Sequence, residues 1–306
     1  MNVYNNINEL PAFNKAVITI GTFDGLHNGH RKIINQLKQE ARLINGTSVV
    51  VTFFPHPRHV LSSTENKVFI LNTLEEKIAL LEAEGIENLV IVPFTSEFSS
   101  MDAEAYINDF LFNCFHPHTI IIGYDHRFGK NRTGNFELLK AGEKKYGYKV
   151  TEITEQQLND IAISSTKIRE KLAKGDIITA NSLLGYHYFF KGKVVKGDQL
   201  GRTIGYPTAN LEIEEQEKLI PGNGVYAVDV MINENKRKGM MNIGVRPTVG
   251  GVLKKIEVNI FDFNEDIYDQ KITVFLKSKL RDEKKFNGLE ELKIQLGNDA
   301  KEAMGI

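Results

Sequence analysis

Residues 16–30 read AVITIGTFDGLHNGH, an apolar run that passes directly into a stretch with three glycines and two histidines. The β-branched residues of the run predict a short buried strand. Apolar residues then recur at helical spacing, at positions 33, 34, 37, 41 and 44. A strand, a glycine turn and a helix in this order predict an anion site, because the free N–H groups and the dipole of a helix N-terminus attract negative charge.

The same alternation of strands and helices continues to about residue 185. Further strand-like runs are SVVVTFF (48–54), NLVIVPF (88–94), TIIIG (119–123) and YKVTEI (148–153). Helical patterns lie around residues 74–81, 102–113, 134–146, 165–175 and 177–185. Buried strands that alternate with helices favour a parallel sheet with helices on both faces. We therefore predict an α/β fold for residues 1–185, with a doubly wound, Rossmann-like parallel sheet.

The pattern changes after residue 186. Strand-like segments at 188–198, 224–232, 238–244, 254–263 and 271–277 are separated by clusters of Gly, Asn and Asp. A helical pattern returns at residues 289–304. Consecutive strands followed by one helix predict a second domain over residues 186–306, a small antiparallel β-barrel with a C-terminal helix.

The composition is that of a soluble globular protein. A formal net charge of −1 gives no bulk attraction to nucleic acid, and the apolar runs are too short to span a membrane. Cys114 is the single cysteine, which excludes an internal disulfide and a cysteine-rich metal site. The N-terminus has neither the basic nor the apolar region of a signal peptide. We predict a cytoplasmic protein without nucleic-acid or membrane partners.

The stretch GTFDGLHNGH (21–30) suits a nucleotide phosphate. Its glycines let the backbone come close to a ligand, and His27 and His30 could donate hydrogen bonds to phosphate oxygens and offset the charge of a phosphoryl transition state. Two other interpretations stay open. The histidines could cap or pack the helix, or they could bind zinc, since His56 and His59 repeat the same spacing.

The stretch at 21–30 resembles the signature of the nucleotidyltransferase superfamily. With it, the motifs along the chain resemble the bacterial bifunctional riboflavin kinase/FAD synthetase family: FFPHPRHVL (53–61), GYDHRFGKNRTGN (123–135), ISSTKIRE (163–170), GRTIGYPTANL (201–211), NIGVRPTVGG (242–251), IEVNIFDFNEDIY (256–268) and LRDEKKF (280–286). The resemblance implies that residues 1–185 form an FMN adenylyltransferase domain, which makes FAD and pyrophosphate from FMN and ATP. It implies that residues 186–306 form a riboflavin kinase domain, which makes FMN. Both reactions would use ATP as co-substrate with Mg²⁺, and no permanently bound cofactor.

In the first domain the resemblance assigns charge stabilisation to His27 and His30. It assigns nucleotide and phosphate contacts to Gly21, Phe23, Asp24, Gly25, Gly29, Ser164, Ser165, Thr166 and Arg169. It assigns flavin contacts to Pro55, His56, Pro57, Asp125, Arg127 and Arg132. Purely structural roles stay open for Asp24 in its turn, for residues 164–166 as a helix cap and for residues 55–57 as a rigid turn.

In the second domain the riboflavin hydroxyl is neutral, so its attack needs a base, and Glu257 is the candidate. The resemblance assigns phosphate contacts to Gly201, Thr208 and Asn210, of which Thr208 and Asn210 would also hold Mg²⁺. It assigns a flavin contact to Arg281. A solvent-facing Glu257 and an ordinary surface Arg281 are the alternatives. The chain departs from the family at Asn259, where relatives often carry His, and at Asp269, where they often carry Gly.

Three rival functions are weighed against the bifunctional enzyme. The first is an FMN adenylyltransferase whose kinase-like domain is inactive. The second is a tRNA-charging enzyme, which would need a basic nucleic-acid surface that the second domain does not offer. The third is a flavin-binding regulator, which two complete phosphate-handling motifs disfavour.

Overall fold

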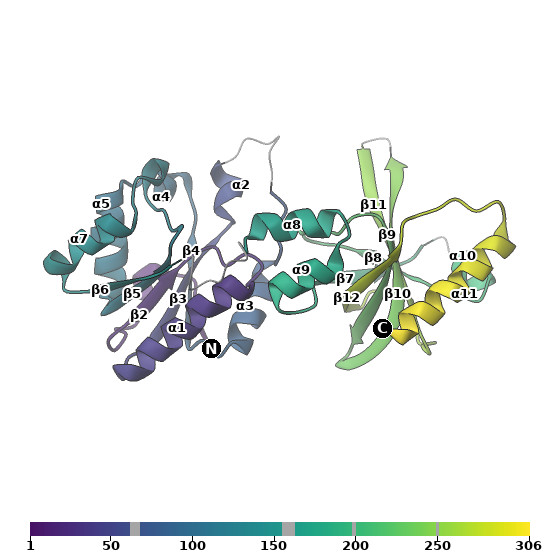
Figure 1. The fold of residues 1–306 in the computed structure, drawn as a ribbon, viewed down its shortest axis with the longest axis horizontal. Coiled ribbons are helices and arrows are strands. Elements are labelled where there is room, and N and C mark those ends of the chain that lie inside the picture. The colour runs from purple at the N-terminus through teal and green to yellow at the C-terminus, as the bar shows by residue number, and fades with distance from the viewer. Residues whose placement is uncertain (62–67, 155–162, 198–199, 249–250) are drawn as a thin grey trace. The chain divides into compact units, whose positions relative to one another are not determined.

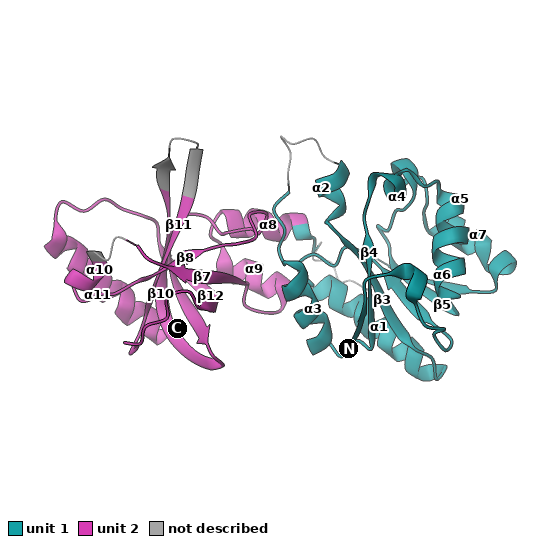
Figure 2. Cartoon of the chain, turned by 180° about the vertical axis from the view of Figure 1, so that it is seen from behind, with its two compact units in different colours: residues 1–165 teal, residues 166–306 magenta. Residues whose placement is uncertain are grey.

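The computed structural model describes residues 1–61, 68–154, 163–197, 200–248 and 251–306. The chain divides into two compact units, residues 1–165 and 166–306, each with its own core (Figure 2). The functional boundary expected at residues 185 and 186 stays a prediction. Helices α8 (Ser165–Ala173) and α9 (Ile177–Leu184), which we assigned to the first domain, lie almost wholly within the second unit.

The first unit is built on a six-stranded parallel sheet with the order β1-β4-β3-β2-β5-β6. The strands are β1 (Asn2–Tyr4), β2 (Val17–Ile20), β3 (Ser48–Phe54), β4 (Asn88–Pro93), β5 (Thr119–Gly123) and β6 (Lys149–Ile153). The chain runs outward from β2 to β3 and β4 and then crosses to β5 on the other side of β2. The strand order therefore reverses between β2 and β5, and open α/β sheets bind their ligands at the carboxyl ends of such strands.

Helices cover both faces of this sheet (Figure 1). They are η1 (Ile7–Glu9), α1 (Asn28–Leu43), α2 (Pro57–Leu61), α3 (Leu74–Ala83), α4 (Ser96–Ser100), α5 (Ala103–Ala105), the π-helix η3 (Tyr106–Phe112), α6 (Asn113–Phe115), η4 (Lys130–Arg132) and α7 (Phe136–Tyr146). Successive residues of a strand point to opposite faces, so Val17 packs with Ile34 and Leu37 of α1, whereas Ile18 packs on the other face.

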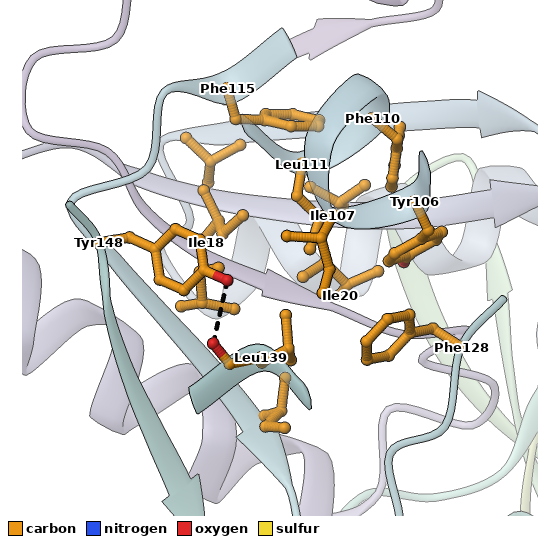
Figure 3. Close-up of a cluster of buried hydrophobic side chains, with 14 of the residues drawn as sticks. Ile18, Ile20, Tyr106, Ile107, Phe110, Leu111, Phe115, Phe128, Leu139 and Tyr148 are labelled. Atoms are coloured by element: carbon orange, nitrogen blue, oxygen red, sulfur yellow. Dashed lines mark hydrogen bonds between the residues drawn. The ribbon is translucent and has the colours of Figure 1, made fainter. Parts of the chain in front are cut away.

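The core on that other face is rich in aromatic side chains (Figure 3). The ring of Tyr106 stacks with that of Phe128 at a centroid distance of 4.8 Å and makes a tilted contact with that of Phe110 at 5.0 Å. The Tyr148 hydroxyl donates to the Leu139 carbonyl at 3.0 Å, so its polar atom is satisfied inside the core. This packing holds the loop after β5 against the sheet.

The second unit is a closed antiparallel barrel with the strand order β10-β11-β8-β7-β12-β9. The strands are β7 (Phe189–Val195), β8 (Ala209–Glu212), β9 (Gly224–Ile232), β10 (Asn235–Thr248), β11 (Gly251–Ile260) and β12 (Lys271–Arg281). The short helix α10 (Leu200–Thr203) precedes β8, and α11 (Leu289–Gly305) packs Ala300 and Ala303 against Ala227 and Met240 of the barrel. The two architectures confirm the predicted fold class.

Candidate functional site

A cavity of about 860 Å³ opens at the carboxyl ends of β2 and β5, where the strand order reverses. It brings together seven of the residues that the sequence analysis selected: Gly21, Phe23, His30, Pro57, Asp125, Arg127 and Arg132. Aromatic side chains, among them Phe53, Phe94 and Phe98, line the remainder. Asp24, Gly25, His27, Gly29, Pro55 and His56 are not among its lining residues. A cavity with aromatic walls and a basic rim suits a flat, anionic ligand.

His27 is the N-cap of α1. Its Nδ1 accepts a hydrogen bond from the His30 backbone N–H at 3.3 Å, which is the capping role that the sequence left open. The His27 and His30 rings stack with centroids 3.7 Å apart and an angle of 14° between their planes. A Cβ at Gly29 would lie 3.1 Å from Nδ1 of His27, so the glycine leaves room for this ring. The catalytic role predicted for His27 stays a prediction.

His30 faces the cavity beside the ring of Phe23. Burial lowers the pKa of His30 well below its usual value, and the nearby His27 and Lys77 lower it further. Its Nδ1 is buried and has no hydrogen-bond partner within the described part of the chain. At neutral pH the ring is therefore uncharged, and one of its nitrogens carries a proton that can be donated to a phosphate oxygen.

Asp24 has a structural role in the turn. Its carboxylate is buried and accepts hydrogen bonds from the backbone N–H groups of Leu71 at 2.9 Å and Asn72 at 3.2 Å. Its backbone carbonyl accepts a hydrogen bond from Ser165 Oγ at 2.8 Å. Asp24 thereby joins the turn to the segment before α3 and to the start of α8. The phosphate contact expected of Asp24 stays a prediction.

The sequence analysis missed Lys77. It lies on α3, only 6% exposed, and its Nζ donates to the Thr22 carbonyl at 2.7 Å. Burial lowers the pKa of Lys77 to about 8, although the Asp24 carboxylate opposes the shift. A lysine within an amphipathic helical pattern normally faces solvent, so its spacing carried no signal of this placement.

The loop after β5 supplies the basic rim of the cavity through the exposed Arg127, Lys130 and Arg132. Burial lowers the pKa of His126 to about 4, and the charges of Arg132 and Arg127 contribute. Its Nε2 is buried without a hydrogen-bond partner among the residues described. His126 is therefore a neutral ring in the wall of the cavity, and no role was predicted for it from the sequence.

The motif ISSTKIRE (163–170), from which phosphate contacts are expected, is divided between the two units. Ser165 belongs to the first unit and begins α8, whereas Thr166 and Arg169 belong to the second. Ser164 directly precedes the helix. Their predicted contacts with the nucleotide stay predictions.

In the barrel, three polar residues lie in one row across adjacent strands. Glu257 of β11 pairs with Asn210 of β8 on one side and with Asn242 of β10 on the other. Directly opposite residues point to the same face of a sheet, with Cβ atoms about 5 Å apart. The neighbours Ile256 and Val258 fill the barrel interior, so the row lies on the outer face.

Glu257 is neither buried nor freely solvated. Its side chain is 27% exposed, and Oε1 forms an ion pair with Lys255 Nζ at 3.2 Å. Asn210 is closely packed, because a Cβ at Gly197 would overlap its side-chain amide. A carboxylate and an amide oxygen held side by side can accept a proton and bind a hard cation, respectively.

Thr208 lies just before β8 and lines a second cavity of about 530 Å³. Arg202, Pro207 and the loop from Phe263 to Tyr268 line the same cavity. The side-chain amide of Asn259 donates to the Pro207 carbonyl at 2.6 Å and fixes the residue before Thr208. Gly201 is equally constrained, because a Cβ there would overlap the Tyr206 carbonyl.

Arg281 is not an isolated surface residue, and it does not line either of the two cavities described above. It makes a bidentate ion pair with the buried Asp299 of α11, with N–O distances of 2.7 to 3.0 Å. Its guanidinium also lies 5.7 Å from the centre of the Phe286 ring. Arg281 thus ties β12 to α11, and the predicted flavin contact stays a prediction.

Neither histidine pair forms a metal centre within the described ranges, where no three His, Cys, Asp or Glu side chains gather around one point. His59 instead places Nε2 2.6 Å from the Val68 carbonyl. Across the same described ranges, every helix is too short or too polar to cross a lipid bilayer.

Comparison with known proteins identifies two family domains along the chain. A family model for FAD synthetase matches residues 10–167, and one for riboflavin kinase matches residues 184–306. The bifunctional riboflavin kinase/FMN adenylyltransferase of Escherichia coli (strain K12) is 38% identical over 95% of this chain and 93% of its own length. The corresponding protein of Bacillus subtilis (strain 168) is 39% identical over 95% of this chain and 92% of its own.

One solved structure covers nearly the whole chain. It is described as a macrolide-efflux protein from Streptococcus pneumoniae, is 32% identical and superimposes with a TM-score of 0.91 over 99% of this chain and 98% of its own. Its fold is therefore the fold of this chain throughout. From the two family models and the near full-length relatives, the chain belongs to the family of bifunctional riboflavin kinase/FMN adenylyltransferases.

Proposed function

We propose that this protein makes both flavin cofactors, and that each domain carries one reaction. Residues 186–306 phosphorylate riboflavin with ATP to give FMN, and residues 1–185 transfer the adenylyl group of ATP to FMN to give FAD and pyrophosphate. The observation that carries the division is the cavity at the β2–β5 reversal, where the glycine turn, His30 and two arginines meet.

Adenylyl transfer requires alignment and charge stabilisation more than a base. An oxygen of the FMN phosphate attacks the α-phosphorus of ATP, a new P–O bond forms, and the bond to pyrophosphate breaks. The attacking group is already anionic, so no proton has to be removed. His30 would donate a hydrogen bond to the oxygens where charge accumulates. Arg127 and Arg132 would attract the two anionic substrates to the cavity rim.

Riboflavin phosphorylation requires a base. The 5′-hydroxyl loses a proton as it attacks the γ-phosphorus, and ADP leaves. Glu257 would accept that proton, since its carboxylate lies beside Asn210 in the cross-strand row. Lys255, paired to it at 3.2 Å, would hold the carboxylate in place.

The magnesium ion enters this site as part of the nucleotide substrate. Thr208 and Asn210 would hold it through neutral oxygens, which fits Mg²⁺ because the phosphates of ATP supply the negative ligands. A Cβ at residue 197 would overlap the side-chain amide of Asn210, which Gly197 avoids. This close packing supports a fixed amide at Asn210. When bound, the ion neutralises phosphate charge during transfer. We propose the cytoplasm as the compartment, because both reactions consume ATP.

The decisive experiment is chromatography of flavins after incubation with riboflavin, ATP and Mg²⁺, beside a parallel reaction that starts from FMN. FMN followed by FAD is the expected result from riboflavin. FAD from added FMN alone would establish the rival, a monofunctional adenylyltransferase with a kinase-like barrel. No product from either flavin would overturn both functions.

A further inference from the structure

Three polar groups meet at the glycine turn: the Thr22 carbonyl and the side chains of Thr52 and Lys77, neither of which lines the cavity. Lys77 Nζ donates to the Thr22 carbonyl at 2.7 Å, Thr52 Oγ1 donates to the same carbonyl at 3.2 Å, and the two side chains lie 3.4 Å apart. Thr52 is fully buried, and Lys77 is nearly so. We propose that Lys77 is a positioning residue for adenylyl transfer, which orients the turn at residues 22–23 toward the nucleotide phosphates; the proposal rests on the function given above.

The orientation follows from the geometry of a peptide. The Thr22 carbonyl and the Phe23 N–H belong to one planar unit, in which a trans bond directs them oppositely. Two donors draw the carbonyl toward α3 and β3, so the Phe23 N–H is turned the other way. Thr22 and Phe23 both line the cavity. Lys77 thus helps to expose a backbone donor without touching the ligand itself.

The turn needs such a tie because its conformation is unfavourable in isolation. Phe23 has a φ of 46° and Leu26 a φ of 33°, in the left-handed region that bulky residues avoid. The contacts that hold it are reciprocal. Asp24 accepts hydrogen bonds from the backbone just before α3, and Lys77 of α3 donates back to the turn.

The start of α3 is itself fixed. Thr73 and Glu76 form a capping box, with hydrogen bonds of 3.2 and 3.0 Å between each side chain and the other residue's backbone N–H. Lys77 is the next residue, so its position along the helix is set by this cap. Helix α3 consequently serves as a rigid support for the turn.

Lys77 also contributes a charge in a poorly solvated place. Asp24 in the turn and His30 on α1 are the titratable groups that interact with it. A cation there would stabilise the anionic phosphates through the turn, since water screens it little. The charge is lost as the pH rises through the pKa of Lys77, about 8.

The test compares Lys77→Met with Lys38→Met. Lys38 also reaches a backbone carbonyl, donating to that of Glu84 at 2.6 Å, and so joins α1 to the end of α3 far from the turn. We expect Lys77→Met to lower kcat for FAD formation by about 10- to 100-fold, with the KM for FMN changed less than about threefold. Lys38→Met should leave both values near those of the wild type. FMN formation by the other unit, measured on the same samples, should be unchanged in both variants.

The dependence of FAD formation on pH distinguishes a charged positioning residue from a lysine that only supports the fold. Wild-type FAD formation should decline above about pH 8, and Lys77→Arg should remove that decline, because arginine keeps its charge. Equal losses in Lys77→Met and Lys38→Met, or an unchanged alkaline limb in Lys77→Arg, would overturn the proposal. If Lys77→Met fails to fold by circular dichroism, the alkaline limb of Lys77→Arg decides alone. Failure of the proposed function itself would appear separately, as a wild-type protein that makes no FAD.

Discussion

The two sites of this enzyme are held in place in different ways. In the first unit, the glycine turn is shaped by buried polar contacts from distant segments, among them Asp24 with Leu71 and Lys77 with Thr22. In the second unit, Asn210, Glu257 and Asn242 are aligned by strand register. Register follows from a period of two along each strand and can be read locally. Hydrogen bonds between segments that are far apart in the sequence cannot be read locally. The first site is therefore expected to be the more sensitive to substitutions outside it.

The sharpest division between the sites is expected from Glu257→Gln. Glutamine keeps the size of the side chain but cannot accept the hydroxyl proton, so FMN formation should fall by about 10²- to 10⁴-fold. FAD formation from added FMN should not change. Quantifying both flavins in one sample gives the comparison, and parallel losses of the two activities would show that the units do not act separately.

At the first site, His30→Ala should do the reverse. Loss of one donor to the reacting phosphate should lower FAD formation by about 10²- to 10³-fold and spare FMN formation. Initial rates with FMN or riboflavin as the substrate measure this directly. A fall in kinase rate of similar size would contradict the assignment.

His27→Asn is the matched change for the neighbouring histidine. Asparagine is a good N-cap, so α1 should keep its start and the melting temperature should stay close to that of the wild type. If capping is the main role of His27, FAD formation should fall no more than about threefold, well short of the loss of one oxyanion donor. A loss as large as that of His30→Ala would establish the catalytic role predicted for His27.

In the barrel, the hydrogen bond from the Asn259 amide to the Pro207 carbonyl is a contact that register does not supply. Asn259→Leu leaves that carbonyl without its donor and should destabilise the protein by about 1–2 kcal/mol. Because Thr208 follows Pro207, the KM for ATP in FMN formation should rise more than kcat falls. Asn259→His, which restores a donor, should recover most of the loss. An unchanged KM would place Asn259 outside the positioning of Thr208.

The smallest expected effect is on the pH dependence of the stability, through His126. The pKa of His126 is depressed to about 4, so below about pH 6.5 the unfolded chain binds a proton that the folded chain excludes. The resulting loss of stability begins below the unfolded pKa and is complete near pH 4. Between pH 7 and 5, His126→Asn should reduce the fall in the free energy of unfolding by at most about 2 kcal/mol. Urea unfolding followed by circular dichroism at both pH values checks this.

Much of the fold could be predicted because its signals are local. The alternation of apolar strands and helices gave the parallel sheet, and the later run of strands gave the barrel, both confirmed here. The strand-like runs predicted for the second domain did not include β8, because the residues GYPT before it are typical of a turn. The π-helix at residues 106–112 was expected only as an ordinary helix, since both share nearly the same apolar spacing.

The candidate sites were predictable only where a motif marks them. Gly21, His30, Arg127 and Arg132 were selected from sequence and line one cavity. Lys77 was not selected, because only the folding of α3 onto the turn gives it a role. Asp269 has a φ of 62°, in the left-handed region. Glycine adopts that conformation without strain, which fits the glycine that the resemblance implies at this position.

The closed barrel also bears on how the protein behaves at high concentration. Each of its strands is hydrogen-bonded to two neighbours, so within the described residues the open edges of β10 and β11 are confined to the parts that extend past β9 and β8. The sheet of the first unit does end in two edges. One of them, β1, has only three residues, and the other, β6, exposes Lys149 and Thr151 along its length. Short and charged edges disfavour intermolecular strand pairing, so both units resist the commonest route by which β-structure aggregates.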